Sequence, residues 1–327
     1  MLNVFITVDT EAWPRHPEWR RSRLREDIER DVYGATPAGR FGVAYQMDVL
    51  DAHGLKAVFF VEALFACATG LASLRQLVSQ IESRGHEVQL HIHPEWLAWI
   101  EPSPLPRRTA QNLKELSQEE QKVLISLGLQ NLREAGAGNV CAFRAGNYGA
   151  NFDTLRALAH HGVRYDTSYN VCYLDSDCGL HTPRALLQPE EIHGVREFPI
   201  TFFQDWPGHF RHAQLCACSS QELEHALDEA WRRGWRSFVL VSHSFELLKR
   251  RKQPPLPPLP DGTVIRRFER LCRFLSTNRD RFGTCGFRDL DNTPLGPCLA
   301  DEPLRSTVRR TAWRFGEQAV RRLWVGR

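Results

Sequence analysis

The fold of this chain is most constrained by an alternation that recurs along its length, in which an amphipathic helical pattern ends at a glycine and a short β-rich run follows. Such helical patterns end at Gly54, Gly85, Gly162 and Gly234, and a β-rich run comes after each glycine. Alternation of this kind is typical of a parallel sheet covered by helices. With six or more such units, we expect an α/β chain folded as a closed or nearly closed barrel.

Two helix starts carry capping boxes, in which a serine and a glutamate three residues later each accept a hydrogen bond from the other's backbone N–H. One capping box consists of Ser117 and Glu120, and the other of Ser219 and Glu222. Apolar residues at helical spacing follow both boxes. We therefore expect helices that begin directly after Ser117 and Ser219.

The composition argues against several classes of protein. The chain has 327 residues, with 42 Lys and Arg against 39 Asp and Glu, so no charged ligand is implied and we expect no nucleic-acid partner. The nine cysteines include no Cys-x-x-Cys pair, which disfavours a disulfide framework. Residues 1–9 resemble a first strand and not a signal peptide, and no apolar run is long enough to span a bilayer. We therefore expect a cytoplasmic protein.

The C-terminal segment 291–327 is expected to form a basic helical tail after a barrel domain of residues 1–290. From residue 304 onward this tail carries seven arginines. Its apolar residues share one face of a helical projection: Val308, Ala312, Phe315 and Ala319. Such a helix could lie on an anionic membrane surface or contact a protein partner. An ordinary terminal helix packed on the barrel is an equal alternative.

Polar side chains gather where the predicted strands end. In a βα barrel the catalytic groups come from the C-terminal ends of several strands. The residues at these ends are carboxylates, imidazoles and one guanidinium: Asp9, Glu11, His91, His93, Glu95, Arg144 and His243. Imidazole and carboxylate are ligands that a divalent ion such as zinc prefers. The cluster from His91 to Glu95 therefore suits a metal site, and we expect the whole set to converge on one mouth of the barrel.

Five segments of the chain resemble the motifs of a known family, the polysaccharide deacetylases, also called NodB-like carbohydrate esterases. Each motif is weak alone, but the five occur in the family's order and cover roughly residues 1 to 250. The matching segments are Thr7–Glu11, Ala57–Val61, Gly85–His91, Phe143–Gly149 and Val239–His243.

The resemblance implies a fold, a cofactor and a reaction. The fold would be a distorted (β/α) barrel of about seven strands, the NodB-like deacetylase barrel. The cofactor would be one divalent metal, usually zinc, held by one carboxylate and two histidines. The reaction would be hydrolysis of an N- or O-acetyl group on a sugar, so the chain would be a metal-dependent carbohydrate deacetylase with an acetylated sugar as its substrate.

The resemblance also assigns roles to individual residues at the metal. Asp9 would be the general base that deprotonates a metal-bound water, Glu11 the carboxylate ligand and His91 the first histidine ligand. The usual second histidine stands four residues after the first, where this chain has Glu95, whereas His93 stands two residues after it. We favour His93 over Glu95 because three carboxylates would otherwise crowd one ion.

The remaining roles concern the acyl group and the proton transfers. Arg144 would orient Asp9 and keep it ionised, since its planar guanidinium can hold a carboxylate through two hydrogen bonds. Tyr148 or Asn147 would supply a backbone N–H to the oxyanion, although this segment has one more residue between Arg and Tyr than the commonest form. His243 would be the general acid that protonates the leaving amine or alkoxide.

Two alternatives remain open alongside the deacetylase reading. The same fold could hydrolyse another non-peptide C–N bond, such as that of a cyclic amide. The irregular position of the second ligand also leaves room for a catalytically inactive sugar-binding or scaffold protein. If the chain is a deacetylase of the cytoplasm, a nucleotide- or lipid-linked precursor, or a small amide, is a better substrate candidate than an extracellular polymer.

Overall fold

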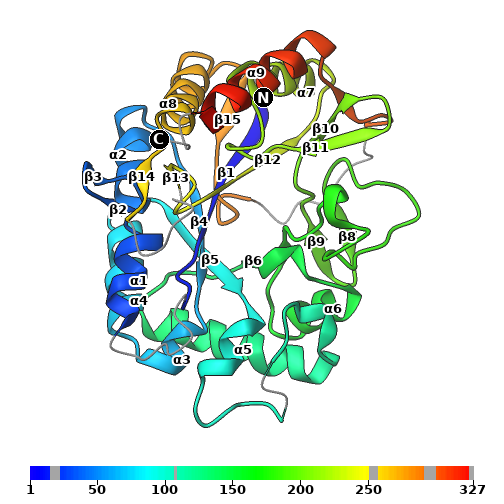
Figure 1. The fold of residues 1–327 in the computed structure, drawn as a ribbon. Helices are drawn as coiled ribbons and strands as arrows, with labels where there is room; N and C mark the ends of the chain where they lie inside the picture. The colour runs from blue at the N-terminus through cyan, green and yellow to red at the C-terminus, as the bar shows by residue number, and fades with distance from the viewer. Residues whose placement is uncertain (15–22, 107–108, 250–256, 291–299, 324–327) are drawn as a thin grey trace.

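A single curled sheet forms the centre of the molecule (Figure 1). The computed structural model describes residues 1–14, 23–106, 109–249, 257–290 and 300–323. The sheet has nine strands: β1 (Leu2–Thr10), β4 (Val58–Glu62), β5 (Glu87–Ile92), β6 (Ala142–Ala145), β7 (Tyr165–Asp166), β8 (Glu190–Ile192), β9 (Val195–Glu197), β12 (Ser237–His243) and β15 (Phe282–Thr284).

The order of these strands confirms the expected α/β barrel in its distorted form. The path runs β12-β1-β4-β5-β6-β7-β9-β8, and β15 pairs with β1. All pairs are parallel except β8 with β9. No strand of the described part joins β8 to β12. Instead, the segment after β9 borders β12, because Thr201 N donates to Val239 O at 3.2 Å and Leu215 N donates to Val241 O at 3.0 Å.

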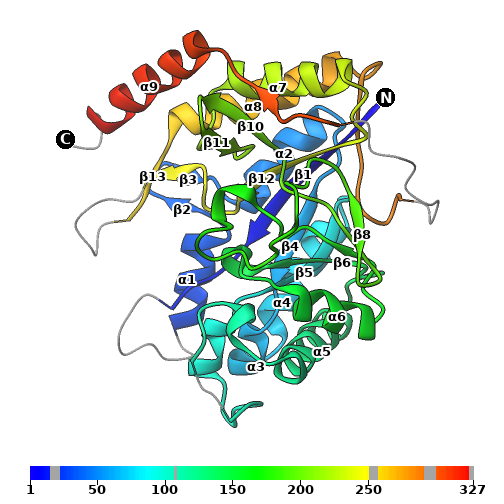
Figure 2. The same cartoon turned by 90° about the vertical axis from the view of Figure 1, so that its right-hand side faces the viewer.

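Helices pack around the outside of this sheet (Figures 1 and 2). The predicted helix starts are confirmed, since Ser117 and Ser219 are the N-caps of α5 and α7, each with a complete capping box. The helices are α1 (Leu24–Asp31), α2 (Val43–Ala52), α3 (Phe65–Thr69), α4 (Ala72–Glu82), α5 (Gln118–Glu134), α6 (Phe152–His160), α7 (Ser220–Arg232), α8 (Gly262–Thr277) and α9 (Val308–Leu323).

The core lies between these helices and the sheet, and it fixes how closely the two layers approach. The strands β4 and β5 are buried along their whole length, as expected of parallel strands covered by helices. In α5, Gly128 faces β5: a Cβ atom built there would come within 2.8 Å of Leu90 and 3.2 Å of Ile92. A side chain at this position would therefore push α5 away from the strand that carries His91.

Smaller sheets and hairpins surround the barrel. The chain after β9 forms β10 (Phe202–Trp206) and β11 (His209–His212), and the tail adds β16 (Leu304–Arg305) to β10. Two hairpins consist of β2 (Ala35–Thr36) with β3 (Gly39–Arg40) and of β13 (Leu248–Lys249) with β14 (Leu259–Pro260). The expected tail helix is present as α9, while residues 291–299 at the predicted domain boundary lie outside the described part.

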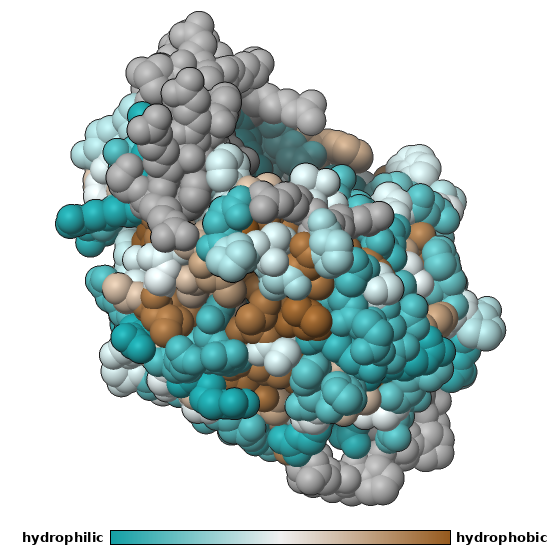
Figure 3. Space-filling view, turned by 90° about the horizontal axis from the view of Figure 1, so that it is seen from below, coloured by the Kyte–Doolittle hydropathy of each residue, from teal (hydrophilic) through white to brown (hydrophobic). Residues whose placement is uncertain are grey.

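The face of the molecule seen from below is mainly hydrophilic, with hydrophobic side chains gathered near its middle (Figure 3). None of the helices in the described ranges is both long and apolar enough to cross a bilayer. All eight described cysteines are free thiols.

Replacing Ser117 with alanine tests the cap of α5. The substitution removes the hydroxyl that accepts the Glu120 N–H at 3.3 Å, so we expect the free energy of unfolding to fall by about 1 kcal/mol. Urea denaturation followed by circular dichroism measures the change. Ser79→Ala, at an exposed position inside α4, is the matched control and should alter stability by less than about 0.5 kcal/mol. Equal effects of the two substitutions would contradict the capping role.

Candidate active site

The strand ends bring the predicted site residues together in one pocket. In the parallel register Asp9 is opposite His243, and His91 is opposite Arg144. The pocket has a volume of about 440 Å³. All the predicted site residues except Arg144 line it: Asp9, Glu11, His91, His93, Glu95, Asn147, Tyr148 and His243. Arg144 is fully buried behind Asp9.

Three of these residues point one ligand atom each at a common point. Glu11 Oε1 lies 3.3 Å from His91 Nε2 and 3.5 Å from His93 Nε2. Two ligands about 2.1 Å from a tetrahedral ion would stand about 3.4 Å apart, so both spacings fit a single small cation. All three side chains are buried. The donor types of these residues and the two separations from Glu11 Oε1 therefore fit a divalent metal.

The other polar atom of each of these side chains is held by a neighbour. The Trp13 indole N–H donates to Glu11 Oε2 at 2.7 Å. His91 Nδ1 donates to the Arg144 carbonyl oxygen at 2.8 Å, which leaves its Nε2 lone pair directed at the cluster. Outer contacts of this kind fix the orientation and the tautomer of metal ligands.

His93 is held in the same way, and its surroundings bear on the choice between His93 and Glu95. His93 Nδ1 donates to Glu95 Oε2 at 3.1 Å, while its buried Nε2 makes no hydrogen bond. A buried nitrogen without a hydrogen bond is costly unless another partner, such as a metal, takes it. Glu95 thus lies on the far side of the ring from Glu11, which favours His93 as the ligand and Glu95 as its orienting partner.

The negative charges in this cluster favour the presence of a cation. Burial alone would raise the pKa of Glu11, but the positive charge of His93 and the contacts of the Glu11 carboxylate with the two imidazole rings hold it well below its usual range. Burial opposes a charge on His93, yet the carboxylates of Glu11 and Glu95 outweigh it and raise the pKa of His93 to about 10. The carboxylates therefore stabilise positive charge at this point, whether it is carried by a proton or by a metal ion.

Asp9 stands beside the cluster and is held by Arg144. Arg144 Nη1 donates to Asp9 Oδ1 at 2.6 Å and to Thr7 Oγ1 at 2.9 Å. The guanidinium carbon also lies 4.5 Å from the centre of the Phe60 ring. Because Oδ1 is bound to Arg144, Oδ2 is the Asp9 oxygen closest to His243, at 3.9 Å from Nε2.

His243 completes the pocket on the side of β12. Its Nδ1 donates to Glu246 Oε2 at 3.0 Å, and its Nε2 faces Asp9 and Glu11. Burial disfavours the charged ring, but the hydrogen bond and the negative charge of Glu246 outweigh burial and raise the pKa of His243 to about 9. At neutral pH the ring therefore carries a proton that it can give to a neighbouring group.

The turn after β6 borders the pocket and contains both predicted oxyanion donors. Asn147 and Tyr148 have φ values of 55° and 59°, in the left-handed region that non-glycine residues seldom adopt. The turn also packs tightly on the cluster of Glu11, His91 and His93, since a Cβ atom at Gly146 would lie 2.4 Å from the His93 ring. Only glycine therefore fits between this turn and His93.

Several residues of the site were not predicted from the sequence. Trp13 and Glu246 hold Glu11 and His243, and Glu62 Oε2 accepts the backbone N–H of His93 at 2.6 Å. Glu62 ends an apolar strand, as Asp9 does, so the same strand-end argument could have found it. Glu246 stands three residues after His243, and this spacing could have identified it as a partner of His243. Trp13 carries no such signal, because the contact of its indole N–H with Glu11 depends on the conformation of residues 11–14, which no local pattern encodes.

Comparison with known proteins shows the fold. No family model and no curated protein sequence matches the chain. A solved structure of a putative polysaccharide deacetylase from Mycobacterium smegmatis is 19% identical, covers 88% of this chain and 87% of its own, and gives a TM-score of 0.52. A family 4 carbohydrate esterase from Streptomyces lividans, in complex with acetate, is 13% identical over 86% of this chain and 91% of its own, with a TM-score of 0.43.

The structural matches also include an enzyme that is named neither as a deacetylase nor as an esterase. The 4-alpha-glucanotransferase from Thermococcus litoralis is 11% identical, covers 88% of this chain and 40% of its own, and has a TM-score of 0.50.

The match to the Mycobacterium smegmatis structure shows that the chain has the NodB-like deacetylase barrel, as the sequence resemblance implied. A fold does not determine a reaction, so the function has to be argued from the site.

Substitutions at His93 and Glu95 test which of these two residues would bind a metal together with Glu11 and His91. We expect His93→Ala to abolish stoichiometric zinc binding, because it removes one of three ligand atoms. Glu95→Gln should keep the ion but weaken its affinity by about 10–100-fold, as loss of an orienting contact does. Zinc titration with a competing chelator measures both. The opposite ranking, with Glu95→Gln the more damaging change, would make Glu95 the ligand.

The tight contact at Gly146 gives a second test of the cluster. Gly146→Ala should displace either the turn or the His93 ring, because the new methyl group would overlap that ring. We expect zinc affinity to fall by about tenfold or more. Gly316→Ala, at a helical glycine with open space around it, is the matched control and should leave affinity unchanged. Retained affinity in Gly146→Ala would show that the cluster does not depend on this packing.

Proposed function

We propose that this chain is a metal-dependent hydrolase that removes an N- or O-acetyl group from a sugar. The observation that supports it most is the adjacency of two sets of groups within one pocket. Three buried donor atoms of Glu11, His91 and His93 converge, and the Asp9 and His243 pair stands beside them with 3.9 Å between Oδ2 and Nε2. Acyl hydrolysis requires such a combination of electrophile, base and acid.

Glu11, His91 and His93 would hold the metal in this proposal. Three protein ligands with a further position open are typical of catalytic zinc sites. When bound there, a divalent ion would polarise the acyl carbonyl and lower the pKa of water. The chain's own residues then have to position the acyl group and move two protons.

Asp9 would be the general base. Its Oδ2 is the oxygen not bound to Arg144, and it faces the interior of the pocket beside Glu11 and His243. Arg144 would hold Asp9 in place and prevent its rotation, because a fully buried guanidinium needs the carboxylate as its partner. Oδ2 is then held ready to accept a proton from the attacking water.

His243 would be the general acid that returns a proton to the leaving nitrogen or oxygen. Its pKa, raised to about 9 by Glu246 against the effect of burial, keeps Nε2 protonated near neutral pH. The backbone N–H of Tyr148 or of Asn147 would stabilise the developing oxyanion, and their left-handed backbone sets the direction of these groups.

The remaining walls of the pocket suit a sugar ring. Aromatic rings of Trp13, Tyr173 and Phe245 provide flat apolar surfaces, and Asp177 and Gln214 provide hydrogen-bonding groups for hydroxyls. The volume of about 440 Å³ lies within the usual range for small-molecule sites, roughly 300–1,000 Å³. One acetylated sugar unit is a ligand of suitable size and polarity.

Substitution of the base and the acid tests the reaction directly. With the zinc-loaded protein, Asp9→Asn and His243→Gln should each lower acetate release from acetylated sugars by about 10²–10⁴-fold, because each removes one proton transfer. Zinc should remain bound, since neither residue is among the three ligands. Asp153, whose side chain is 40% exposed, and the exposed His181 supply the matched controls Asp153→Asn and His181→Gln, which should keep full activity.

The same assay separates the alternatives. Hydrolysis of cyclic ureides with no acetate release from sugars would replace deacetylation by cleavage of another C–N bond. Binding of sugars without turnover, together with less than stoichiometric zinc in the purified protein, would indicate an inactive sugar-binding protein. Unchanged acetate release in Asp9→Asn would contradict the mechanism.

A further inference from the structure

The last helix of the chain turns its apolar side to solvent. The four apolar residues that the sequence places on one face, Val308, Ala312, Phe315 and Ala319, are all exposed and are called the outer stripe below. Val308 and Phe315 are 57% and 58% exposed. Figures 1 and 2 show α9 at the edge of the molecule, with its C-terminal end pointing away from the barrel in Figure 2.

The opposite side of α9 is polar, and it is the side that packs on the barrel. Arg314 is buried and binds Asp205 at 2.7 Å and Glu222 at 3.1 Å. Thr311 is buried beside it and donates to the Asp205 carbonyl oxygen at 3.0 Å. A helix that belongs only to a globular fold normally buries its apolar stripe and exposes its charges. In α9 this arrangement is reversed.

Further ion pairs anchor the helix in this orientation. Arg267 of α8 binds Glu317 at 2.6 Å, and Arg321 binds Asp261 at 2.5 Å. Both contacts use residues on the polar side of α9. The buried acids of the barrel bind the arginines on the polar side of α9. The outer stripe therefore faces solvent.

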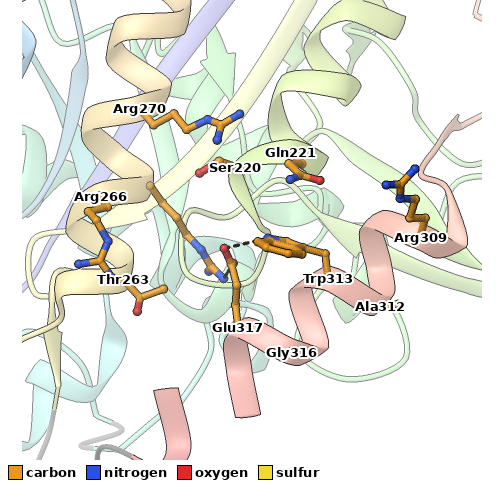
Figure 4. Close-up of a pocket in the computed structure, with 11 residues that line it drawn as sticks. Ser220, Gln221, Thr263, Arg266, Arg270, Arg309, Ala312, Trp313, Gly316 and Glu317 are labelled. Atoms are coloured by element: carbon orange, nitrogen blue, oxygen red, sulfur yellow. Dashed lines mark hydrogen bonds and ion pairs between the residues drawn. The ribbon is translucent and has the colours of Figure 1, made fainter. Parts of the chain in front are cut away.

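A basic groove runs beside the outer stripe, between α7, α8 and α9 (Figure 4). Its volume is about 920 Å³, and Arg266 and Arg270 of α8 line it opposite Arg309 of α9. Arg270 is paired with Glu224, whereas Arg266 and Arg309 form no ion pair with any residue of the described ranges. Trp313, 55% exposed, projects from α9 into this groove and donates its N–H to Glu317 at 3.1 Å.

We propose that α9 and this groove bind the surface of an anionic lipid bilayer. The outer stripe would enter the boundary between headgroups and acyl chains, and Arg266 and Arg309 would receive the lipid phosphates. Helices that lie in a membrane interface combine a large apolar side with basic residues and tryptophan, as α9 does. The segment from residue 304 carries seven arginines and one acidic residue, and five arginines remain besides Arg314 and Arg321, which bind acids of the barrel, so its charge is complementary to such a surface.

The same charges disfavour a second copy of the chain as the occupant. Self-association through the outer stripe would bring two sets of unpaired arginines together, and like charges in contact oppose binding. The inference concerns binding only and stands whether or not the pocket hydrolyses an acetyl group. A failure of lipid binding would leave the proposed reaction untouched, and the reverse also holds.

Vesicle flotation with the full chain tests the proposal. We expect binding to vesicles of phosphatidylcholine with one third phosphatidylglycerol, and not to vesicles of phosphatidylcholine alone. Phe315→Ser and the double variant Arg266→Glu with Arg309→Glu should each weaken binding by about tenfold or more. Val123→Ser, at an apolar position of α5 that is 40% exposed, is the matched control and should bind as the unmodified chain does.

The replaced side chains are exposed, so we expect unchanged melting temperatures and circular dichroism spectra. Absence of binding to both kinds of vesicle would overturn the proposal. So would equal binding of all variants. A dimer in analytical ultracentrifugation that Phe315→Ser abolishes, without any lipid binding, would assign the outer stripe to a second copy instead.

Discussion

Arg144 connects the two halves of the candidate site, and the rest of the site depends on it. Its backbone oxygen accepts the Nδ1 proton of His91, and its guanidinium holds Asp9. One residue of β6 thereby orients a candidate metal ligand and the candidate base. The side chain is fully buried, so loss of its carboxylate partner would cost about 3–5 kcal/mol. The pairing of Arg144 with Asp9 therefore stabilises the fold and also orients the candidate base.

The parallel register explains why so much of the site could be predicted. Parallel strands end at the same edge, so polar residues at the ends of β1, β5, β6 and β12 had to meet. The choice between His93 and Glu95 could not be made from spacing alone, because it depends on the short 3-10 helix Pro94–Trp99 that follows His93. There Glu95 turns back to the outer nitrogen of the His93 ring. The contact of Trp13 with Glu11 depends likewise on loop packing that no local pattern encodes.

The orientation of the C-terminal helix could not be predicted from the sequence. Periodicity predicted the helix and its apolar stripe, but not which side would face the barrel. That side is determined by Asp205 and Glu222, two acids from β10 and α7 that become neighbours only in the folded chain. Buried acids need cationic partners, and Arg314 binds both of these acids, while Arg211 also pairs with Asp205. The apolar stripe of α9 is exposed as a result, and this exposure is the basis for proposing a lipid surface as its partner.

The central claim is that Glu11, His91 and His93 form a metal site beside Asp9 and His243. Anomalous diffraction at the zinc edge, from crystals of the protein grown with zinc, tests it most directly. The account predicts one ordered ion within about 2.0–2.2 Å of Glu11 Oε1 and of the Nε2 atoms of His91 and His93. An ion held by Glu95 in place of His93, or no ordered ion in the pocket at all, would contradict it.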